Sequence, residues 1–263
     1  MLPGKSHPPG PAGGEARAAE HPREGGIRVL FVDDHLVVVD KPCGMPSVPA
    51  RTPADPPDVA RVLAARMPDL GGAEAVHRLD RDTSGLLVLA RRRDARRALG
   101  AAFESGGVEK SYVALVRGAP PEAEGTLCLP LAADPHAPPR HRVDPVLGRP
   151  ATTRWWTIDG PSPRAGATAL RLEPVTGRSH QLRVHLAWLG CPVLGDRLYG
   201  GPEADVEPRM WLHAARLALP HPADGRRLAW NVPLCLAWDR PPGGEDQAGS
   251  SVGTSAERLT PFQ

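Results

Sequence analysis

The sequence has no apolar run of about 18 residues, the length that a membrane-spanning helix needs, and no Cys-x-x-Cys pair. Its N-terminus also lacks the apolar segment of a secretory signal. The four cysteines, Cys43, Cys128, Cys191 and Cys235, are too widely spaced for a disulfide framework, so we expect them to be small buried apolar residues in a reducing compartment. These absences predict a cytoplasmic protein with no membrane span.

Charge of one sign is not in excess either. The 32 Lys and Arg residues nearly balance the 30 Asp and Glu residues, so the net charge of +2 predicts neither a nucleic-acid nor an acidic partner. Basic residues do gather locally, within residues 91–97 and 140–154. Such runs are typical both of solvated helix faces and of nucleic-acid surfaces, and composition leaves both alternatives open.

The apolar share of 41% in 263 residues is enough for a substantial core. Residues 1–25 and 241–263 are instead rich in Pro, Gly and charge, which predicts disordered tails. We therefore expect a folded domain over residues 26–240.

Strand patterns are the commonest patterns between the tails. They cover residues 27–32, 36–40, 85–90, 111–117, 152–158, 167–172, 210–217 and 227–230. Helical patterns cover only residues 59–67, 93–103 and 180–189. Many strands with few, irregularly placed helices predict an α+β fold with a mixed, largely antiparallel sheet.

Two further segments carry local signals. In the helix expected over residues 180–189, Ser179 can cap the first turn and Gly190 can end the helix in the left-handed conformation. Residues 130–150 are too rich in proline for regular structure and too basic for a plain linker. From a loop of this kind, Arg140 and Arg142 can reach phosphates or base edges.

The most informative segment is Ala75-Val76-His77-Arg78-Leu79-Asp80-Arg81-Asp82-Thr83-Ser84-Gly85, followed by the apolar run 86–90. That run predicts a strand covered on both faces, so the polar loop before it should line the floor of a cleft. Positive charge on Arg78 and Arg81 favours an ionised Asp80, which makes this carboxylate a candidate nucleophile or base.

Other interpretations of these residues exist. Asp80, Asp82, Thr83 and Ser84 are all good turn formers, so the segment can be a plain turn. An aspartic protease would need a second Asp-Thr-Gly or Asp-Ser-Gly turn, and the chain has none. His77, His180 and His185 lack the spacing of a helical metal pair, so we expect no metal.

Four segments in order resemble those of the RluA-type pseudouridine synthases, a family of RNA-modifying enzymes. They are Val39-Asp40-Lys41-Pro42-Cys43-Gly44, His77-Arg78-Leu79-Asp80-x-x-Thr83-Ser84-Gly85, Glu109-Lys110-Ser111-Tyr112 and Thr176-Gly177-Arg178-Ser179-His180-Gln181-Leu182-Arg183. Residues 194–199 and 212–214 follow at similar spacing, and the resemblance covers about residues 27–238. Four motifs in sequence make coincidence improbable.

The resemblance implies a pseudouridine synthase fold around a central RNA-binding cleft. It also implies isomerisation of uridine to pseudouridine in structured RNA, without cofactor or metal, after the target base is flipped out. The chain is most similar to family members that modify a tRNA anticodon stem-loop, a large-subunit rRNA hairpin, or both. We expect such an enzyme to act as a cytoplasmic monomer.

Roles for individual residues follow from the same resemblance. Asp80 is implied to be the catalytic carboxylate, Tyr112 to stack on the target uracil, and Arg183 to pair with Asp80. Helical pattern alone would place Arg183 in solvent, one position off the apolar stripe. Arg78 is implied to enter the space that the flipped nucleotide leaves, while Lys41 and Arg178 are candidates for contacts with the RNA backbone.

An alternative of another class is a catalytically inactive RNA-binding module or chaperone with the same fold. The joint presence of Asp80, Tyr112 and Arg183 argues against it.

Overall fold

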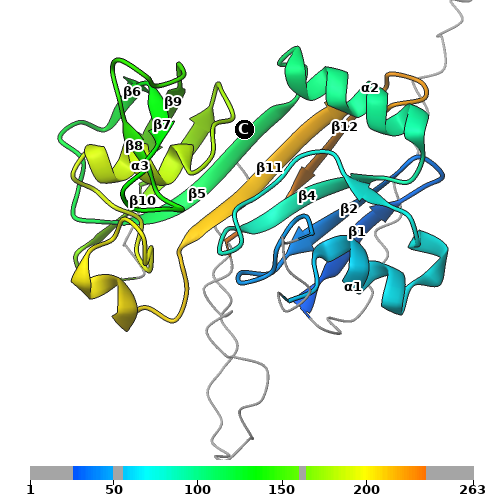
Figure 1. Ribbon diagram of the computed structural model, residues 1–263, viewed down its shortest axis with the longest axis horizontal. Helices are drawn as coiled ribbons and strands as arrows, with labels where there is room; N and C mark the ends of the chain where they lie inside the picture. The colour runs from blue at the N-terminus through cyan, green and yellow to red at the C-terminus, as the bar shows by residue number, and fades with distance from the viewer. Residues whose placement is uncertain (1–25, 50–55, 160–163, 235–263) are drawn as a thin grey trace, which may run out of the picture.

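A computed structural model describes residues 26–49, 56–159 and 164–234. The expected tails, residues 1–25 and 241–263, lie outside this range, as does Cys235. The described elements, shown in Figure 1, are β1 (Arg28–Val32), β2 (Leu36–Lys41), α1 (Val59–Arg66), η2 (Pro68–Leu70), β3 (Glu74–Ala75), β4 (Ser84–Ala90), α2 (Arg93–Glu104), β5 (Glu109–Arg117), β6 (Glu124–Cys128), β7 (Leu131–Ala133), β8 (His141–Val143), β9 (Thr152–Thr157), β10 (Ala167–Pro174), α3 (Gln181–Trp188), η3 (Pro202–Val206), β11 (Leu212–Pro220) and β12 (Arg227–Asn231).

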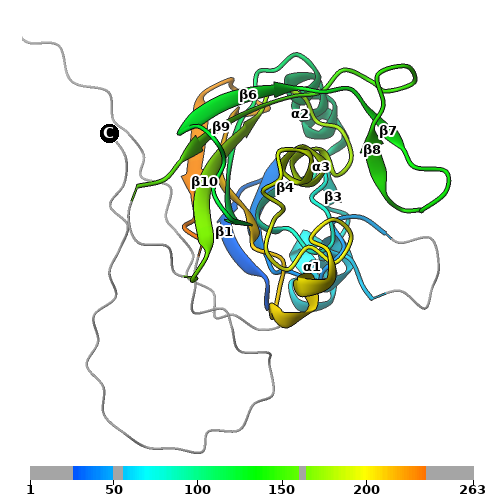
Figure 2. The same cartoon turned by 90° about the vertical axis from the view of Figure 1, so that its left-hand side faces the viewer.

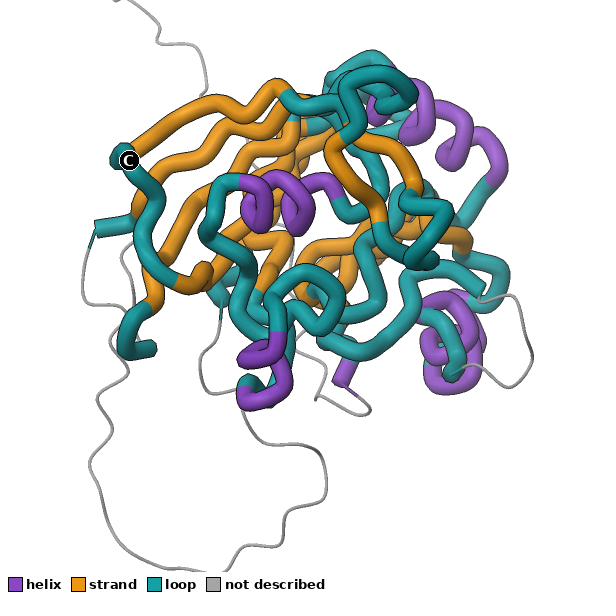
Figure 3. The backbone as a smooth tube through the Cα atoms, turned by 60° about the vertical axis from the view of Figure 1, so that its left-hand side comes forward, coloured by secondary structure: helices purple, strands orange, loops and turns teal. Residues whose placement is uncertain are grey.

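Ten of the described strands form one sheet in the order β1-β2-β4-β11-β5-β10-β9-β6, with β12 beside β11 and β3 beside β4. All the pairings in it are antiparallel except that of β4 with β11. Figure 3 shows the strands as one extended layer with helices and long loops against it. The predicted α+β fold with a mixed, largely antiparallel sheet is therefore confirmed.

Strands β2 and β4 are buried along their whole length, as the continuous apolar run predicts. Successive side chains of a strand point to opposite faces, and here the two faces are covered by different helices. Leu87 and Leu89 pack in the cluster that contains α1, whereas Leu86 and Val88 pack in the cluster that contains α2. The loop before β4 thus enters a strand that is fixed from both sides.

Helix α3 lies on the same side of the sheet as α1, as Figure 2 shows. It covers the neighbouring half of that face, where Leu182 and Leu186 pack against strands β5 and β10. Tyr112 on β5 packs against the clusters of both helices. Tyr112 thus lies on the sheet face between the part covered by α1 and the part covered by α3.

The expectation of an irregular segment over residues 130–150 is wrong in part, because β7 and β8 form a short hairpin there. Acidic side chains stabilise its turns. Asp134 accepts a hydrogen bond from the backbone N–H of His136, and Asp144 accepts from the N–H groups of Val146 and Leu147. Three-residue strands are too short to show a clear alternation in sequence.

Helix α3 begins differently from the prediction. Ser179 does not cap it; instead the side chain of Gln181 turns back and accepts a hydrogen bond from the N–H of Arg178 at 3.0 Å. Gly190 has φ +82 after the end of the helix, so the predicted left-handed termination is confirmed.

The three described cysteines differ in burial, although all were expected to be buried. Cys191 is buried, Cys43 is half-buried and Cys128 is exposed on β6, so the expectation of burial is wrong for Cys128. Cys128 lies on β6, a strand at the edge of the sheet in which only Leu127 is buried. In the described ranges, no helix is long and apolar enough to cross a membrane.

Gly85 is required where the parallel strands β4 and β11 meet. It has φ +109, and a Cβ atom would overlap the carbonyl oxygen of Ala214 and lie 2.6 Å from its nitrogen.

We expect Gly85→Ala to lower the free energy of unfolding by about 3 kcal/mol or more, measured by urea denaturation. Gly100→Ala in α2 is the matched control, because nothing lies within 4 Å there and alanine favours a helix. Equal stabilities of the two variants would contradict this account.

His213 on β11 gives a pH dependence of stability. Burial lowers its pKa from 6.5 to about 4, so as the pH falls below 6.5 the unfolded chain binds a proton that the folded chain does not. Stability falls accordingly, by about 2 kcal/mol between pH 7.5 and pH 5 from this group. His213→Asn removes the titration and retains an amide for the hydrogen bond to Ser84. The variant should therefore lose about 2 kcal/mol less than the wild type over this range, whereas identical losses would contradict the assignment.

Candidate active site

A cleft of about 640 Å³ lies over the sheet beside α3. Its walls come from the loop before β4, the end of α2, the start of β5, and the segment that leads from β10 into α3. Three of the residues singled out from sequence, Asp80, Tyr112 and Arg183, line this one cleft. Positions more than 100 residues apart in the chain are thus brought together.

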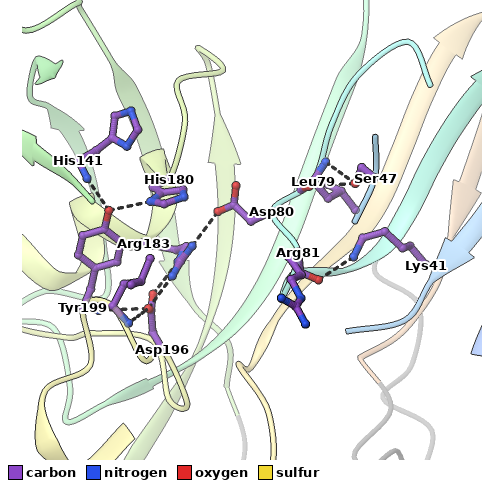
Figure 4. Close-up of polar contacts among 11 residues, drawn as sticks. Lys41, Ser47, Leu79, Asp80, Arg81, His141, His180, Arg183, Asp196 and Tyr199 are labelled. Atoms are coloured by element: carbon purple, nitrogen blue, oxygen red, sulfur yellow. Dashed lines mark hydrogen bonds and ion pairs between the residues drawn. The ribbon is translucent and has the colours of Figure 1, made fainter. Parts of the chain in front are cut away.

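The loop that carries Asp80 is fixed on both sides of the carboxylate. The hydroxyl of Ser47 donates to the carbonyl of Leu79 at 2.9 Å and accepts from the N–H of the same residue at 3.0 Å. On the other side, Lys41 Nζ donates to the carbonyl of Arg81 at 3.0 Å (Figure 4). The backbone therefore holds the Asp80 side chain at the cleft without help from a ligand.

Lys41 is fully buried, and its ammonium donates to the carbonyls of Pro42, Met45 and Arg81 at 2.8–3.0 Å. Three donors thereby meet three acceptors. Burial lowers the pKa of Lys41 to about 8, so the group is still mostly charged at neutral pH. The structure does not support the expected RNA contact by Lys41, because the side chain has neither a free donor nor access to solvent.

Arg183 joins Asp80 to a second carboxylate, Asp196. Its Nη1 donates to Asp80 Oδ2 at 3.1 Å, while Nε and Nη2 each donate to Asp196 at 2.7 Å (Figure 4). The side chain of Asp196 is fully buried, that of Arg183 is 5% exposed, and that of Asp80 is 20% exposed. Although burial opposes it, hydrogen bonding to the two acids raises the pKa of Arg183 further, so the guanidinium is permanently charged.

The contact between Asp80 and Arg183 is the one that the family resemblance implied. The flanking arginines are arranged differently from the expectation. Arg81 donates from Nε to the carbonyl of Gly44, and Arg78 is exposed at the cleft without an ion pair to any described residue. The cation that holds Asp80 therefore comes from α3 and not from the adjacent residues.

Helical pattern failed for Arg183 because residues 181–186 of α3 are all buried. The side of the helix that faces away from the sheet is covered by the β7–β8 hairpin, which the sequence did not show. Asp196 was also missed as a site residue. Its only signal was the segment Leu194–Tyr199, which has family-like spacing but suggested no role.

Tyr112 lies on the cleft floor. Burial raises the pKa of its phenol, and the nearby negative charge of Asp80 raises it further. The hydroxyl is therefore neutral over the physiological range. A neutral aromatic ring at the floor of a cleft is suited to stack on a planar base.

The basic residues expected at the RNA differ in their surroundings. Arg178 lines the cleft and donates from Nε to the carbonyl of Pro150, and exposed Arg140 lies 5.3 Å over the ring of Tyr199. Arg142 instead lies between Asp134 and Asp144, at 3.6 and 3.0 Å. The structure does not support a phosphate contact by Arg142, because two carboxylates already balance its charge.

Lys110 is a basic cleft residue to which the sequence gave no role. It lines the cleft beside Tyr112, and a Cβ atom on Gly177 would lie 3.9 Å from its Nζ. The family motif contained it, but lysine at the start of a strand carries no further signal. Within the described ranges, no group of three His, Cys, Asp or Glu side chains is arranged to hold a metal ion.

Comparison with known sequences identifies relatives over most of the chain. Residues 35–188 match the RNA pseudouridylate synthase family. The chain is 41% identical over 213 residues to the dual-specificity RNA pseudouridine synthase RluA of Escherichia coli strain K12, covering 81% of this chain and 95% of that protein. It is 38% identical over 212 residues to the protein of the same name from Haemophilus influenzae, covering 80% and 94%.

Solved structures give the same result. Human RNA pseudouridylate synthase domain containing 1 superposes with a TM-score of 0.68 at 27% identity, over 80% of this chain and 85% of that one. Human RNA pseudouridylate synthase domain containing 4 gives 0.64 at 25% identity, over 80% and 89%.

The buried charges around Arg183 predict a particular pattern of stabilities. Arg183→Met leaves Asp196 buried without its cation, so we expect a loss of about 3–5 kcal/mol in the free energy of unfolding. Asp196 also accepts from the N–H groups of Leu198 and Tyr199, and asparagine can keep these bonds. The double variant Arg183→Met/Asp196→Asn should therefore be more stable than Arg183→Met alone. Urea denaturation of the single and double variants tests this, and additive losses would contradict it.

Proposed function

Because the chain belongs to the RNA pseudouridylate synthase family, we propose that Asp80 is the carboxylate with which this enzyme isomerises uridine to pseudouridine. One observation carries the proposal: a carboxylate on a fixed loop opens into a cleft while a buried guanidinium holds one of its oxygens. Arg183 engages Oδ2, and in the described part of the chain no hydrogen bond engages Oδ1. One oxygen is thus available to the substrate.

The reaction breaks the bond between C1′ and N1, turns the uracil over, and joins C1′ to C5. N1 gains a proton and C5 loses one, so no oxidant or reductant is consumed. Asp80 acts as nucleophile or as base in this sequence of steps. A base bound over the cleft excludes water, which disfavours an isolated carboxylate, and the charge of Arg183 opposes that effect.

Tyr112 is proposed to stack on the target uracil. It lies on the floor of the same cleft as Asp80, and its neutral hydroxyl provides a polar group at the edge of an aromatic face. In this position the ring holds the base above the sheet and near the carboxylate.

The substrate is proposed to be a structured RNA that presents the uridine in a loop, either a tRNA anticodon stem-loop, a large-subunit rRNA hairpin, or both. Relatives that are named dual-specificity RNA pseudouridine synthases support two substrates. Arg78, exposed at the cleft, is proposed to enter the space that the flipped nucleotide leaves. Arg178 and Arg140 are proposed to contact phosphates beside it.

We also propose that residues 26–240 form the catalytic domain and that the enzyme acts as a monomer in the cytoplasm. The described strands of the large sheet and the residues that line the cleft all lie in this range, which supports the proposed domain. Independence from cofactors and metals stays a prediction, based on the chemistry of the isomerisation.

Asp80→Asn should abolish turnover, because the amide can neither attack nor accept a proton. The assay uses a tRNA anticodon stem-loop and a large-subunit rRNA hairpin with tritium at C5 of the uridines, and it measures release of tritium. We expect the rate to fall at least about a thousandfold with RNA affinity within a few-fold of wild type. Asp82→Asn, two residues along the same loop, is the matched control and should stay active.

Two results would contradict the proposal. Full turnover by Asp80→Asn would remove the role of the carboxylate. RNA binding by the wild type without tritium release from either RNA would instead favour the catalytically inactive binding module.

A further inference from the structure

The backbone at His180 is unusual for its residue type. His180 has φ 55 and ψ 15, and it is the one non-glycine residue with positive φ in the described part of the chain. The left-handed conformation costs a residue with a Cβ atom about 1–3 kcal/mol, and such residues cluster at functional sites. His180 directly precedes α3 and lines the cleft that contains Asp80. Its ring is therefore held at the cleft at a cost to stability.

One ring nitrogen of His180 is held by Tyr199. The phenol oxygen of Tyr199 accepts a hydrogen bond from the backbone N–H of His141 at 2.7 Å and lies 2.8 Å from His180 Nδ1. In the described part of the chain, Nδ1 is the one acceptor within hydrogen-bonding distance of this hydroxyl, so we assign the phenol proton to Nδ1. Nδ1 then acts as acceptor, and Nε2 of the neutral ring carries the proton.

Tyr199 is itself firmly placed. Its backbone N–H donates to Asp196, and its ring has the guanidiniums of Arg183 and Arg140 within 5.1 and 5.3 Å. Figure 4 shows the His180 ring between Tyr199 and Asp80. In the described part of the chain no group hydrogen-bonds to Nε2, so this donor is available to a ligand in the cleft.

The charges around the ring favour its neutral form. Burial lowers the pKa of His180, and the positive charge of Arg183 and the neighbouring His141 act in the same direction. Asp80 and Asp196 oppose these effects but do not outweigh them. A neutral N–H donor is suited to an uncharged acceptor, because a phosphate would be met better by a cation.

We propose that His180 donates a hydrogen bond from Nε2 to a carbonyl oxygen of the target uracil, and that Tyr199 is a positioning residue that holds His180 in this tautomer. The inference rests on the proposed binding of the target nucleotide at Asp80. Turning uracil over about its N3–C6 axis exchanges N1 with C5 and also O2 with O4. A fixed donor that meets one carbonyl before the turn therefore meets the other after it.

Two substitutions distinguish an effect of the Nε2 donor on catalysis from an effect on folding. His180→Asn keeps an amide near the position of Nδ1 and suits the left-handed backbone, but it has no group at the position of Nε2. His180→Gln can place an N–H near Nε2. We expect His180→Asn to lower kcat about tenfold to a hundredfold with little change in KM or in unfolding free energy, and His180→Gln to recover part of kcat.

The tritium-release assay gives the decisive outcomes. Turnover by His180→Asn equal to that of an active wild type would overturn the inference while leaving the role of Asp80 intact. Loss of kcat that parallels loss of stability, without recovery in His180→Gln, would show a structural role and also overturn it. An inactive wild type would instead be a failure of the proposed function.

Substrate analogues identify the acceptor. Sulfur is a weaker hydrogen-bond acceptor than oxygen, so 2-thiouridine or 4-thiouridine at the target should slow the wild type more than it slows His180→Asn. Equal slowing of both enzymes by both analogues would contradict a bond to a uracil carbonyl.

The role of Tyr199 has a separate test. Tyr199→Phe removes the proton that Nδ1 accepts, so the neutral His180 ring can carry its proton on Nδ1 and kcat should fall at neutral pH, whereas below about pH 6.5 protonation restores the Nε2 proton and part of kcat. In the His180→Asn background the same substitution should not change the pH profile. A Tyr199→Phe profile equal to that of the wild type would contradict the positioning role.

Discussion

The contact of Arg183 with two carboxylates is the interaction on which the rest of the site depends. The buried guanidinium needs Asp196 as a partner, because a lone buried charge would be costly. Asp196 uses two of the three guanidinium nitrogens, which leaves Nη1 directed at Asp80. The geometry of Asp80 is therefore set by residues on α3 and on the loop after it, and the two sides of the cleft are joined by one side chain.

The loop that carries Asp80 is anchored in the sheet. The parallel pairing of β4 with β11 places Gly85 against Ala214, and the loop that carries Asp80 ends there. Lys41 and Ser47 fix the backbone of the same loop through its carbonyls. The loop that carries Asp80 is held on one side of the cleft, and Arg183 joins α3 to it from the other. The cleft is therefore preformed, and substrate binding does not have to order the catalytic groups.

The sequence could predict those features that have a local signal. The apolar run 86–90 identified a strand buried on both faces, and Gly190 identified the end of α3. Arg183 shows where this fails: its burial depends on the β7–β8 hairpin over α3, and short strands in a proline-rich segment have no clear periodicity. Lys41 and Arg142 were expected to contact the RNA because they are basic. In the structure Lys41 is buried and bonded to three carbonyls, and Arg142 is paired with two carboxylates. The left-handed conformation of His180 and its bond to Tyr199 depend on contacts that only the folded chain has.

The most direct test is a crystal structure of the Asp80→Asn variant with a bound RNA hairpin. We predict that one uridine is flipped out of the RNA, that its uracil stacks on Tyr112, and that residue 80 lies within hydrogen-bonding distance of that nucleoside while Arg183 still contacts Asp196. A target nucleotide bound outside this cleft, or Arg183 turned away from residue 80 in the complex, would contradict the account.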